Sequence, residues 1–216
     1  EIHESLDGVC EYRVLLVDDA STDESSNIID DLADQYDTVR GLHFEENAGQ
    51  SAAFAAGFER ANSTYIATMD ADRQNDPADI PELLEAMDRT DADAVLGYRE
   101  QRRDGWKKRL GSYLANRLRN TLLGEDVRDT GCSLKLFRRE VVDSFPLFEG
   151  MHRFFPSLLH RGGYDFRQIP TTHRPRPWGE TKYSLTGRFR KVVLDLFGVA
   201  WLKARSINVQ VDEGSG

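Results

Sequence analysis

The chain of 216 residues has little cysteine and no long hydrophobic run. Its two cysteines, Cys10 and Cys132, lie far apart and lack the spacing of metal ligands. We therefore expect reduced, packed thiols in a cytosolic protein, rather than a disulfide framework or a zinc site. The most apolar stretch, residues 192–202, is too short to cross a bilayer and contains Asp195. The first residues lack the basic start and the apolar stretch of a secretory signal.

Positive charge is also scarce. The formal net charge is −9 at pH 7, from 28 basic and 37 acidic side chains, which argues against a general nucleic-acid-binding protein. An anionic ligand would have to be held by a local cluster of Arg and Lys, against the overall sign. Hydrophobic residues make up 39% of the chain and charged residues 30%, as expected for one soluble globular domain of this length.

Apolar and helical segments alternate along the first half of the chain. Continuous apolar runs indicate strands that are covered on both faces, and the spacing predicts an α/β fold with a doubly wound, mostly parallel sheet flanked by helices. The second half is less regular, with a helix predicted over residues 107–124 and a strand over 131–137. The strands predicted in the first half are residues 12–19, 39–44, 64–70 and 93–98.

Polar side chains follow each of these predicted strands. In a doubly wound sheet, ligands bind beyond the carboxyl ends of the strands. The polar residues would therefore share one edge of the sheet with a ligand. They are Asp18 and Asp19 at the end of the first strand, Asn47 after the second, Asp70 and Asp72 at the end of the third, and Arg99 after the fourth.

Asp70, Asp72 and Gln74 occupy alternate positions just after a strand of the buried type. Alternate residues of an extended chain point the same way, so these side chains could face one point. Two close carboxylates repel unless a cation lies between them, and Mg²⁺ or Mn²⁺ prefers such oxygen ligands. A metal that bridges the protein to a diphosphate fits this pattern. The alternative is that Asp72 and Asp76 are only turn and cap residues, as aspartate often is.

Several motifs, which follow one another in a fixed order, cover nearly the whole chain. They include VLLVDDASTDES (residues 14–25), MDADRQNDPADIPELL (69–84), DTGCSLKLFRREVV (129–142) and HRPRPWGETKYSLTGRFRK (173–191). Together these motifs resemble a family 2 glycosyltransferase with the GT-A fold. The resemblance is to the polyprenyl-phosphate branch, which includes dolichol-phosphate mannose synthase and bacterial undecaprenyl-phosphate sugar transferases.

The resemblance implies a donor site built from the first and third strand ends. Asp18 and Asp19 correspond to a pair that lies near the nucleotide base in the family, with Asp70 also on the nucleotide side. Asp70, Asp72 and Gln74 correspond to the signature that holds the divalent metal, Mg²⁺ or Mn²⁺. The same signature holds the diphosphate of the donor, here a GDP-sugar or a UDP-sugar.

The resemblance also implies contacts to phosphate elsewhere in the chain. A loop that carries Arg176 and Lys182 closes on phosphates in the family. Both residues are therefore expected to act in catalysis together with the three metal ligands. The residues implied for acceptor or phosphate binding are Arg99, Asp129, Ser133 and Thr181.

The sequence departs from the family at its start. The family begins with a strand that carries a P-x-Y-N-E-like motif, and no such motif is present here. The sheet is therefore expected to lack that central strand, and the nucleotide base to lack one wall. The family's C-terminal transmembrane helices are absent from this sequence too. Arg73 stands where the family usually has an apolar residue, and nothing in the sequence explains it.

The implied reaction is an inverting transfer of a sugar from a nucleotide diphosphate sugar to a polyprenyl phosphate, either dolichyl or undecaprenyl. The nucleophile would be an oxygen of the acceptor phosphate. A phosphate monoester has a second pKa of about 6, so this oxygen is largely ionised at neutral pH and needs no strong base. The reaction instead needs cations that position two anions and limit their repulsion.

Two other functions stay open. A family 2 transferase acting on a saccharide hydroxyl would need a carboxylate base, for which Asp129 is the one candidate. A GT-A fragment without the first strand could instead be a non-catalytic, partner-binding domain.

We divide the chain into a catalytic domain (residues 1–187), a closing helix (188–205) and a tail (206–216). The helix is amphipathic, aromatic and flanked by basic residues, which is typical of a helix at a membrane surface. Packing on the domain or on a partner subunit explains the pattern equally well, so a membrane contact and a homo-oligomer both stay open. The expected location is the cytoplasm, with peripheral contact at the inner face of the membrane.

Overall fold

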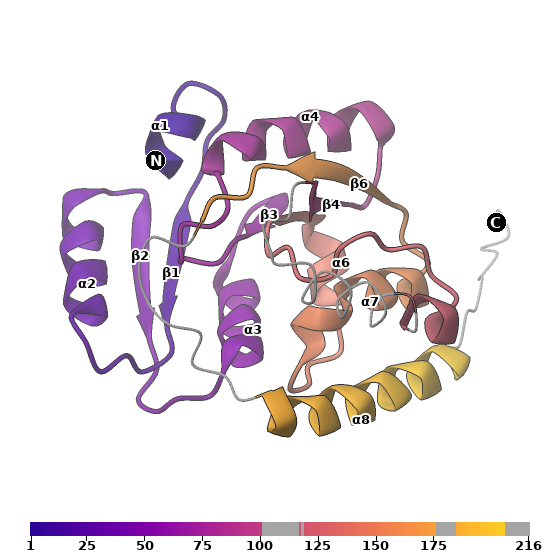
Figure 1. Cartoon of the computed structure of the whole chain (residues 1–216). Helices are drawn as coiled ribbons and strands as arrows, with labels where there is room; N and C mark the ends of the chain where they lie inside the picture. Colours follow the sequence, from indigo (N-terminus) through magenta and orange to yellow (C-terminus); the bar gives the residue numbers. More distant parts are fainter. Residues whose placement is uncertain (101–116, 118, 176–184, 206–216) are drawn as a thin grey trace, which may run out of the picture.

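Strands and helices alternate along the chain, as the sequence predicts (Figure 1). The computed structural model describes residues 1–100, 117, 119–175 and 185–205, and in the last helix the side chains from Leu194 onwards. The strands are β1 (Val14–Asp18), β2 (Val39–His43), β3 (Tyr65–Thr68), β4 (Ala94–Arg99), β5 (Lys135–Arg138) and β6 (Phe166–Thr171).

Helices surround these strands (Figure 1). Residues 119–123 are helical and form the described end of the helix predicted over 107–124. Two short 3₁₀ helices are η1 (Pro77–Asp79) and η2 (Met151–Phe154). The α-helices are α1 (Ile2–Leu6), α2 (Ser25–Gln35), α3 (Gln50–Arg60), α4 (Ile80–Thr90), α6 (Arg139–Asp143), α7 (Phe155–Gly162) and α8 (Leu185–Ala204).

The strands form two hydrogen-bonded groups. β1 and β2 are parallel, with Val14 opposite Val39. The second group has the order β3–β5–β4–β6, in which β4 is parallel to β6 and β5 runs antiparallel to β3 and β4. The sheet is therefore mixed, with two parallel and two antiparallel pairings among the described strands, and the predicted α/β fold class is confirmed. Among the described residues, no strand lies between β1 and β3. This division fits a sheet without the family's first, central strand.

The hydrophobic core lies on both faces of the four-stranded group. Val95 and its cross-strand neighbour Leu136 face α4, where they join a cluster that includes Met87. Ala94 and its neighbour Phe137 face the opposite layer, formed by α3, α6 and α7. This alternation has the period of two that is expected for strands covered on both faces. It fixes the register of the strands, and with it which residues lie at the strand ends beside the site.

The two cysteines are both free, but only one of them is packed. Cys132 is buried in the core next to β5, whereas Cys10 is exposed in the segment between α1 and β1. The expectation of packed thiols is therefore correct for Cys132 and wrong for Cys10, because Cys10 lies in a surface connection between two elements.

α8 runs along the bottom of the molecule in the view of Figure 1. Val199 is buried against Leu123 and Phe154, and Leu196 and Ala200 pack beside it. Among the described helices, none combines the length and the apolarity that crossing a bilayer requires.

Candidate active site

The turn after β3 carries Asp70. Its backbone amide donates to Ser133 Oγ at 3.1 Å, and its carboxylate accepts from Gln50 Nε2 at 2.8 Å. Gln50 is the first residue of α3, and Ser133 lies just before β5. The position of Asp70 is thus fixed from two elements that are distant in the sequence. Gln50 was not expected at the site, because its partner is 20 residues away and no local pattern links the two.

Asp70 and Asp72 are close enough for their charges to interact. Burial raises the pKa of the Asp70 carboxyl, and repulsion from Asp72 raises it further. Hydrogen bonds from Ser133 and Gln50, together with the charge of Lys135, act in the opposite direction. A partly buried carboxylate beside a second carboxylate is an environment that a divalent cation would stabilise. The pair therefore fits the predicted Mg²⁺ or Mn²⁺ site.

The other two predicted metal ligands, Asp72 and Gln74, also contact groups of the protein itself. Asp72 Oδ1 accepts from the backbone amide of Gln74 at 3.0 Å, so Asp72 is also a turn residue. The Gln74 Nε2 atom lies 3.5 Å from His173 Nε2. Within the described residues, no group of three or more His, Cys, Asp or Glu side chains could hold a metal ion. A metal here would thus have two carboxylate ligands and would take its remaining ligands from Gln74, water and the diphosphate.

The segment after β6 lies beside the turn of Asp72 and Gln74. The Arg174 amide donates to the Gln74 carbonyl at 2.8 Å, and Asn75 forms a bridge with His173. This pairing starts the predicted phosphate loop next to the predicted metal ligands. The loop residues themselves, Arg176, Thr181 and Lys182, lie outside the described residues.

Arg73 now has a structural explanation. Its φ is +62°, a left-handed conformation that is uncommon for residues other than glycine. This turn separates Asp72 from Gln74, and the Arg73 side chain extends to Glu1 Oε1 at 2.8 Å.

Asp18 is buried at the end of β1 and is fully engaged by the protein. It accepts hydrogen bonds from the Ser21 amide at 3.0 Å and from Ser26 Oγ, and His43 Nδ1 lies 3.3 Å away. The hydrogen bonds from Ser21 and Ser26 hold the pKa of the Asp18 carboxyl well below its usual range. His43 also contacts Asp30 at 3.0 Å. The hydrogen bond to Asp18, and to a smaller extent that to Asp30, raises the pKa of the His43 imidazole.

Asp19 organises the loop that precedes α3. Its carboxylate accepts from the Ala48 amide at 2.7 Å, from the Gly49 amide at 2.9 Å and from Asn47 Nδ2 at 2.9 Å. Gly49 has φ +88°, which the glycine tolerates without strain. Two of the three predicted nucleotide residues, Asp18 and Asp19, therefore hold loops at the expected edge of the sheet.

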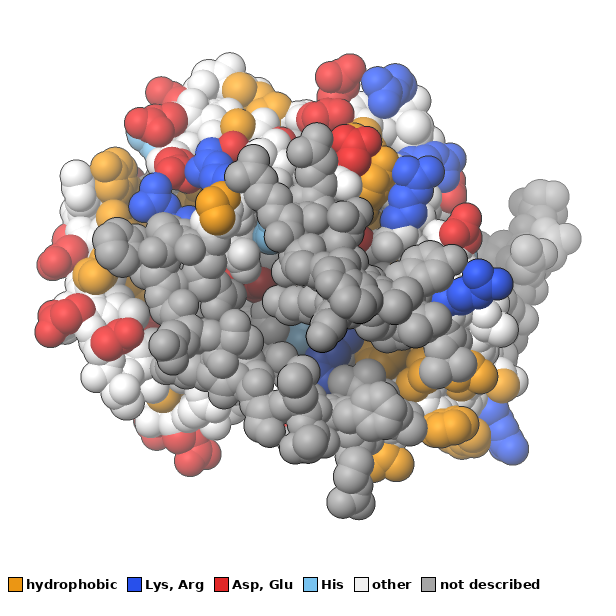
Figure 2. All heavy atoms as spheres, viewed as in Figure 1, with side chains coloured by type: hydrophobic (Ala, Val, Ile, Leu, Met, Phe, Trp, Pro, Cys, Tyr) orange, Lys and Arg blue, Asp and Glu red, His pale blue; other side chains and the backbone are white. Residues whose placement is uncertain are grey.

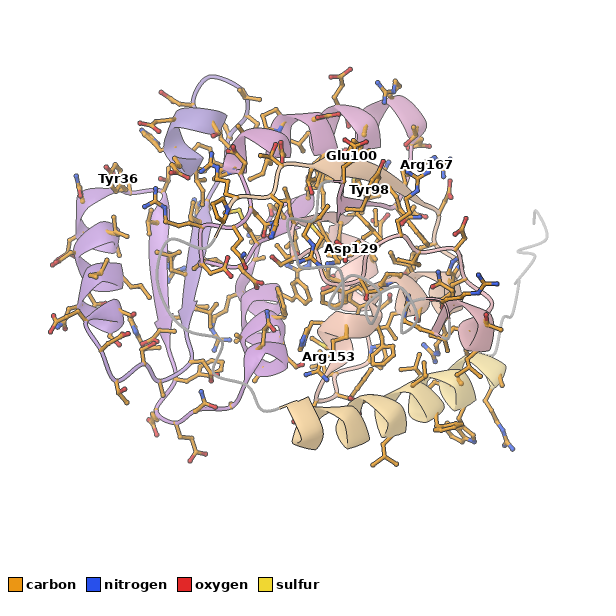
Figure 3. The ribbon with its side chains drawn as sticks, viewed as in Figure 1. Tyr36, Tyr98, Glu100, Asp129, Arg153 and Arg167 are labelled. Carbon is orange, nitrogen blue, oxygen red and sulfur yellow. The ribbon has the colours of Figure 1, made fainter. Side chains whose placement is uncertain are left out.

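Arg99 and Asp129 form a bidentate ion pair at the end of β4. Arg99 Nε and Nη2 donate to the Asp129 carboxylate at 2.6 and 3.0 Å, and the Gly131 amide donates to the same carboxylate at 2.9 Å. Asp129 lies near the middle of the molecule, close to Tyr98 of β4 (Figure 3). Because both oxygens of this buried carboxylate accept hydrogen bonds, Asp129 is poorly placed to act as a general base.

Ser133 connects the two halves of the site. Its hydroxyl donates to Asn75 Oδ1 at 2.7 Å and accepts a hydrogen bond from the Asp70 amide. Its carbonyl accepts from Thr68 Oγ1 at 2.8 Å. The segment 129–133 thus carries Asp129, which holds Arg99, and Ser133, which holds Asp70. It brings the predicted metal side and the predicted phosphate side together.

Lys135 is buried behind this segment. Its side-chain nitrogen donates to the Cys132 carbonyl, and burial lowers its pKa, while Cys132, Asp129 and Asp70 act in the opposite direction. Both carboxylate sites therefore offset part of the burial that disfavours the charged form of Lys135. The signal in the sequence is one lysine within an otherwise apolar strand, LKLF, but burial there depends on pairing with β3 and β4.

Comparisons with known proteins identify the family of the chain. The family model described as Glycosyl transferase family 2 matches residues 1–145. A dodecaprenyl-phosphate galacturonate synthase from Rhizobium johnstonii is 36% identical over 192 residues, which are 87% of this chain and 56% of that protein. An undecaprenyl-phosphate 4-deoxy-4-formamido-L-arabinose transferase from Enterobacter sp. (strain 638) is 35% identical over 175 residues, which are 81% and 53% of the two chains. The chain spans about half the length of these relatives.

Solved structures share the fold. Glucosyl-3-phosphoglycerate synthase from Mycobacterium tuberculosis, in complex with UDP, aligns with a TM-score of 0.69 at 16% identity and covers 93% of this chain and 74% of its own. A mannosyltransferase from Pyrobaculum calidifontis, in complex with GDP-Man and Mn²⁺, aligns with a TM-score of 0.58 at 17% identity. The alignment covers 96% of this chain and 61% of the mannosyltransferase. The fold is thus that of the GT-A glycosyltransferases, and the chain belongs to glycosyl transferase family 2.

Proposed function

We propose that this chain is the catalytic domain of a metal-dependent, inverting glycosyltransferase that moves a sugar from a nucleotide diphosphate sugar to a polyprenyl phosphate. The observation that carries the proposal is that segment 129–133 holds both Asp70 of the carboxylate pair and Arg99. Under this proposal, a site for a cation and its diphosphate would lie beside a site for a second anion. The names of the two relatives, which specify dodecaprenyl and undecaprenyl phosphate, support a lipid phosphate as the acceptor.

The donor side would be formed by Asp70, Asp72 and Gln74. A bound Mg²⁺ or Mn²⁺ would offset the negative charge that develops on the leaving nucleotide diphosphate. Gln50 orients the Asp70 carboxylate, and Ser133 holds the backbone of the same residue. The neighbours in complex with Mn²⁺ and UDP-glucose or GDP-Man support this choice of cofactor and donor class.

The acceptor side would be formed by Arg99, positioned by Asp129, with Arg176, Thr181 and Lys182 supplied by the loop after β6. These residues would hold the acceptor phosphate and limit its repulsion from the donor diphosphate. An ionised phosphate oxygen attacks without help from a base. The engagement of Asp129 by Arg99 and Gly131 fits this acceptor better than a saccharide hydroxyl, which would need Asp129 as a base.

Two comparisons suggest different sugars for the transfer. The resemblance to dolichol-phosphate mannose synthase favours GDP-mannose, whereas the relatives' names carry a galacturonate and a formamido-arabinose. The donor set to be tested therefore includes both GDP-sugars and UDP-sugars.

A product assay tests the proposal. The chain is incubated with Mn²⁺, a panel of UDP- and GDP-sugars, and a short polyprenyl phosphate, and the lipid fraction is analysed by mass spectrometry. We expect one donor to give a sugar phospholipid, and EDTA to abolish its formation. In a parallel reaction with free saccharides, transfer to a saccharide but not to the lipid phosphate would support the hydroxyl acceptor instead. Nucleotide binding without any product would support a non-catalytic domain.

A further inference from the structure

The segment that begins with η2 is buried except at one point. Between Met151 and Leu159, only His152 and Arg153 are not buried, and both are partly exposed. Met151 and Phe154, on either side of this pair, are 1 and 2% exposed and belong to the core. The segment therefore presents a histidine and an arginine together, on a turn whose other side chains are packed inside the protein.

Two contacts fix this turn against the first turn of α3. His152 Nδ1 lies 2.9 Å from Ser51 Oγ, and the Gly150 amide donates to the same hydroxyl at 2.8 Å. Gln50, the residue before Ser51, donates to the Asp70 carboxylate. η2 is therefore attached to the same helix turn that orients the first of the proposed metal ligands, and it lies beside the donor side of the candidate active site.

The guanidinium of Arg153 lies over Gly150, between α3 and α8. Its Nη1 atom is 3.7 Å from the point where a Cβ atom of Gly150 would stand, and 3.7 Å from Asp195 Oδ2 of α8. In Figure 3, Arg153 lies next to the first half of α8. Figure 2, viewed from the same side, shows basic and histidine side chains at the surface near the middle of this face. With 33% of its side chain exposed, Arg153 is accessible to a ligand from this side.

The contact with Asp195 leaves the donors of Arg153 available. A separation of 3.7 Å is too long for a hydrogen bond, so this pair is a contact between charges only. Arg99 differs, because its Nε and Nη2 already donate to Asp129 at 2.6 and 3.0 Å. A guanidinium presents its N–H groups as a rigid fork that matches the two oxygens of a carboxylate or phosphate. Arg153 can therefore offer an oxyanion the paired donors that Arg99 gives to Asp129.

We propose that Arg153 is a further substrate-binding residue of the candidate active site and that it binds an oxyanion other than the metal-bound diphosphate. This inference rests on the proposed function, which brings two such groups to the site. They are the phosphate of the acceptor and, where the sugar is a uronate, its carboxylate. A cation beside the Asp70 and Asp72 carboxylates would limit their repulsion of either group. His152 is a positioning residue, because its Nδ1 contacts Ser51 and holds the turn against α3.

Binding of matched ligands tests this inference. With Mn²⁺ present, the wild type and Arg153→Gln are titrated with a short polyprenyl phosphate and its polyprenol, with UDP-glucuronate and UDP-glucose, and with GDP-mannuronate and GDP-mannose. The two ligands of each pair differ by one oxyanion. We expect the wild type to prefer the anionic member of at least one pair, and Arg153→Gln to bind that member at least about tenfold more weakly, because charged hydrogen bonds are lost. A loss in the lipid pair assigns Arg153 to the acceptor phosphate, and a loss in a sugar pair assigns it to the carboxylate.

Asp195→Asn separates oxyanion binding from a structural role. If Arg153 only held α8 through Asp195, both Arg153→Gln and Asp195→Asn would weaken binding equally. If Arg153 binds the oxyanion, Asp195→Asn should bind it at least as tightly as the wild type, because a competing carboxylate is gone. Arg153→Lys keeps the charge without the fork, so it should fall between the wild type and Arg153→Gln, and it covers the case in which Arg153→Gln does not fold. Arg89→Gln, at an exposed arginine of α4, is the matched control and should bind like the wild type.

Three results would overturn the inference: equal losses in Arg153→Gln and Asp195→Asn, unchanged affinity in both Arg153 variants, or a wild type without preference for the anionic ligands. None of these measurements depends on sugar transfer. An overturned inference in a chain that still forms the sugar phospholipid would leave the proposed function intact. Oxyanion binding through Arg153 in a chain that transfers no sugar would remove the proposed function alone.

Discussion

At the scale of single residues, the site depends on side chains whose partners are inside the protein. Asp129 binds Arg99 through both carboxylate oxygens, and Gln50 binds Asp70. A bidentate carboxylate fixes the plane of a guanidinium, which determines the direction from which an anion can be bound. Asp129 is thus a positioning residue in this account, and Arg99 is the group that would touch phosphate.

Gly131 provides the space that this ion pair needs. A Cβ atom at Gly131 would lie 2.7 Å from Arg99 Nη2, so Gly131→Ala would displace the guanidinium. We expect the KM for the polyprenyl phosphate to rise by about tenfold, the cost of a weakened charged hydrogen bond, with the affinity for the donor nucleotide unchanged. Steady-state kinetics with each substrate varied in turn measures both effects.

Gly57→Ala is the control for this prediction. Its Cβ would lie 3.8 Å from Val17 Cγ2, an ordinary contact, so both KM values should stay at the wild-type level. An unchanged acceptor KM in Gly131→Ala would show that the position of Arg99 does not matter for acceptor binding.

At the scale of elements, the sequence predicts what depends on local patterns. The predicted strands and their polar ends are present, because alternation and apolar runs act over a few residues. The antiparallel β5 between β3 and β4 was not predicted in its direction or place, since pairing depends on residues far apart in the chain. The same reason explains the missed partners: Gln50 meets Asp70, and His43 meets Asp18, only after folding.

His43 joins the end of β2 to β1 and α2, through Asp18 and Asp30. Since its pKa is raised above the ordinary 6.5 in the folded state, its contribution to stability is complete below that value. The contribution is lost as the pH rises through the raised pKa. We therefore expect His43→Gln to lower the free energy of unfolding more at pH 6 than at pH 8, as measured by urea denaturation.

Asp30→Asn provides the comparison for His43→Gln. Asp30 is 68% exposed, so solvent screens its interaction with His43, and its removal should change the pH dependence less. If the stability of His43→Gln ran parallel to that of the wild type between pH 6 and pH 8, the ion pair with Asp18 would contribute nothing.

At the scale of the whole molecule, the chain combines a proposed cation site, an arginine held by a carboxylate, and an exposed apolar helix face. Segment 129–133 links the first two, and η2 and α3 link them to α8. In the proposed function, donor binding depends mainly on the diphosphate and on the metal that Asp70 and Asp72 would hold.

Isothermal titration of UDP and GDP, with and without Mn²⁺, tests this central claim most directly. The proteins compared are the wild type, Asp70→Asn, Asp72→Asn and the control Asp31→Asn, whose side chain is exposed on α2. We predict that one nucleotide binds the wild type and the control only with Mn²⁺, and that both site variants lose at least about tenfold in affinity with an unchanged Tm. Binding that is equally strong without Mn²⁺, or that both site variants retain, would contradict the account.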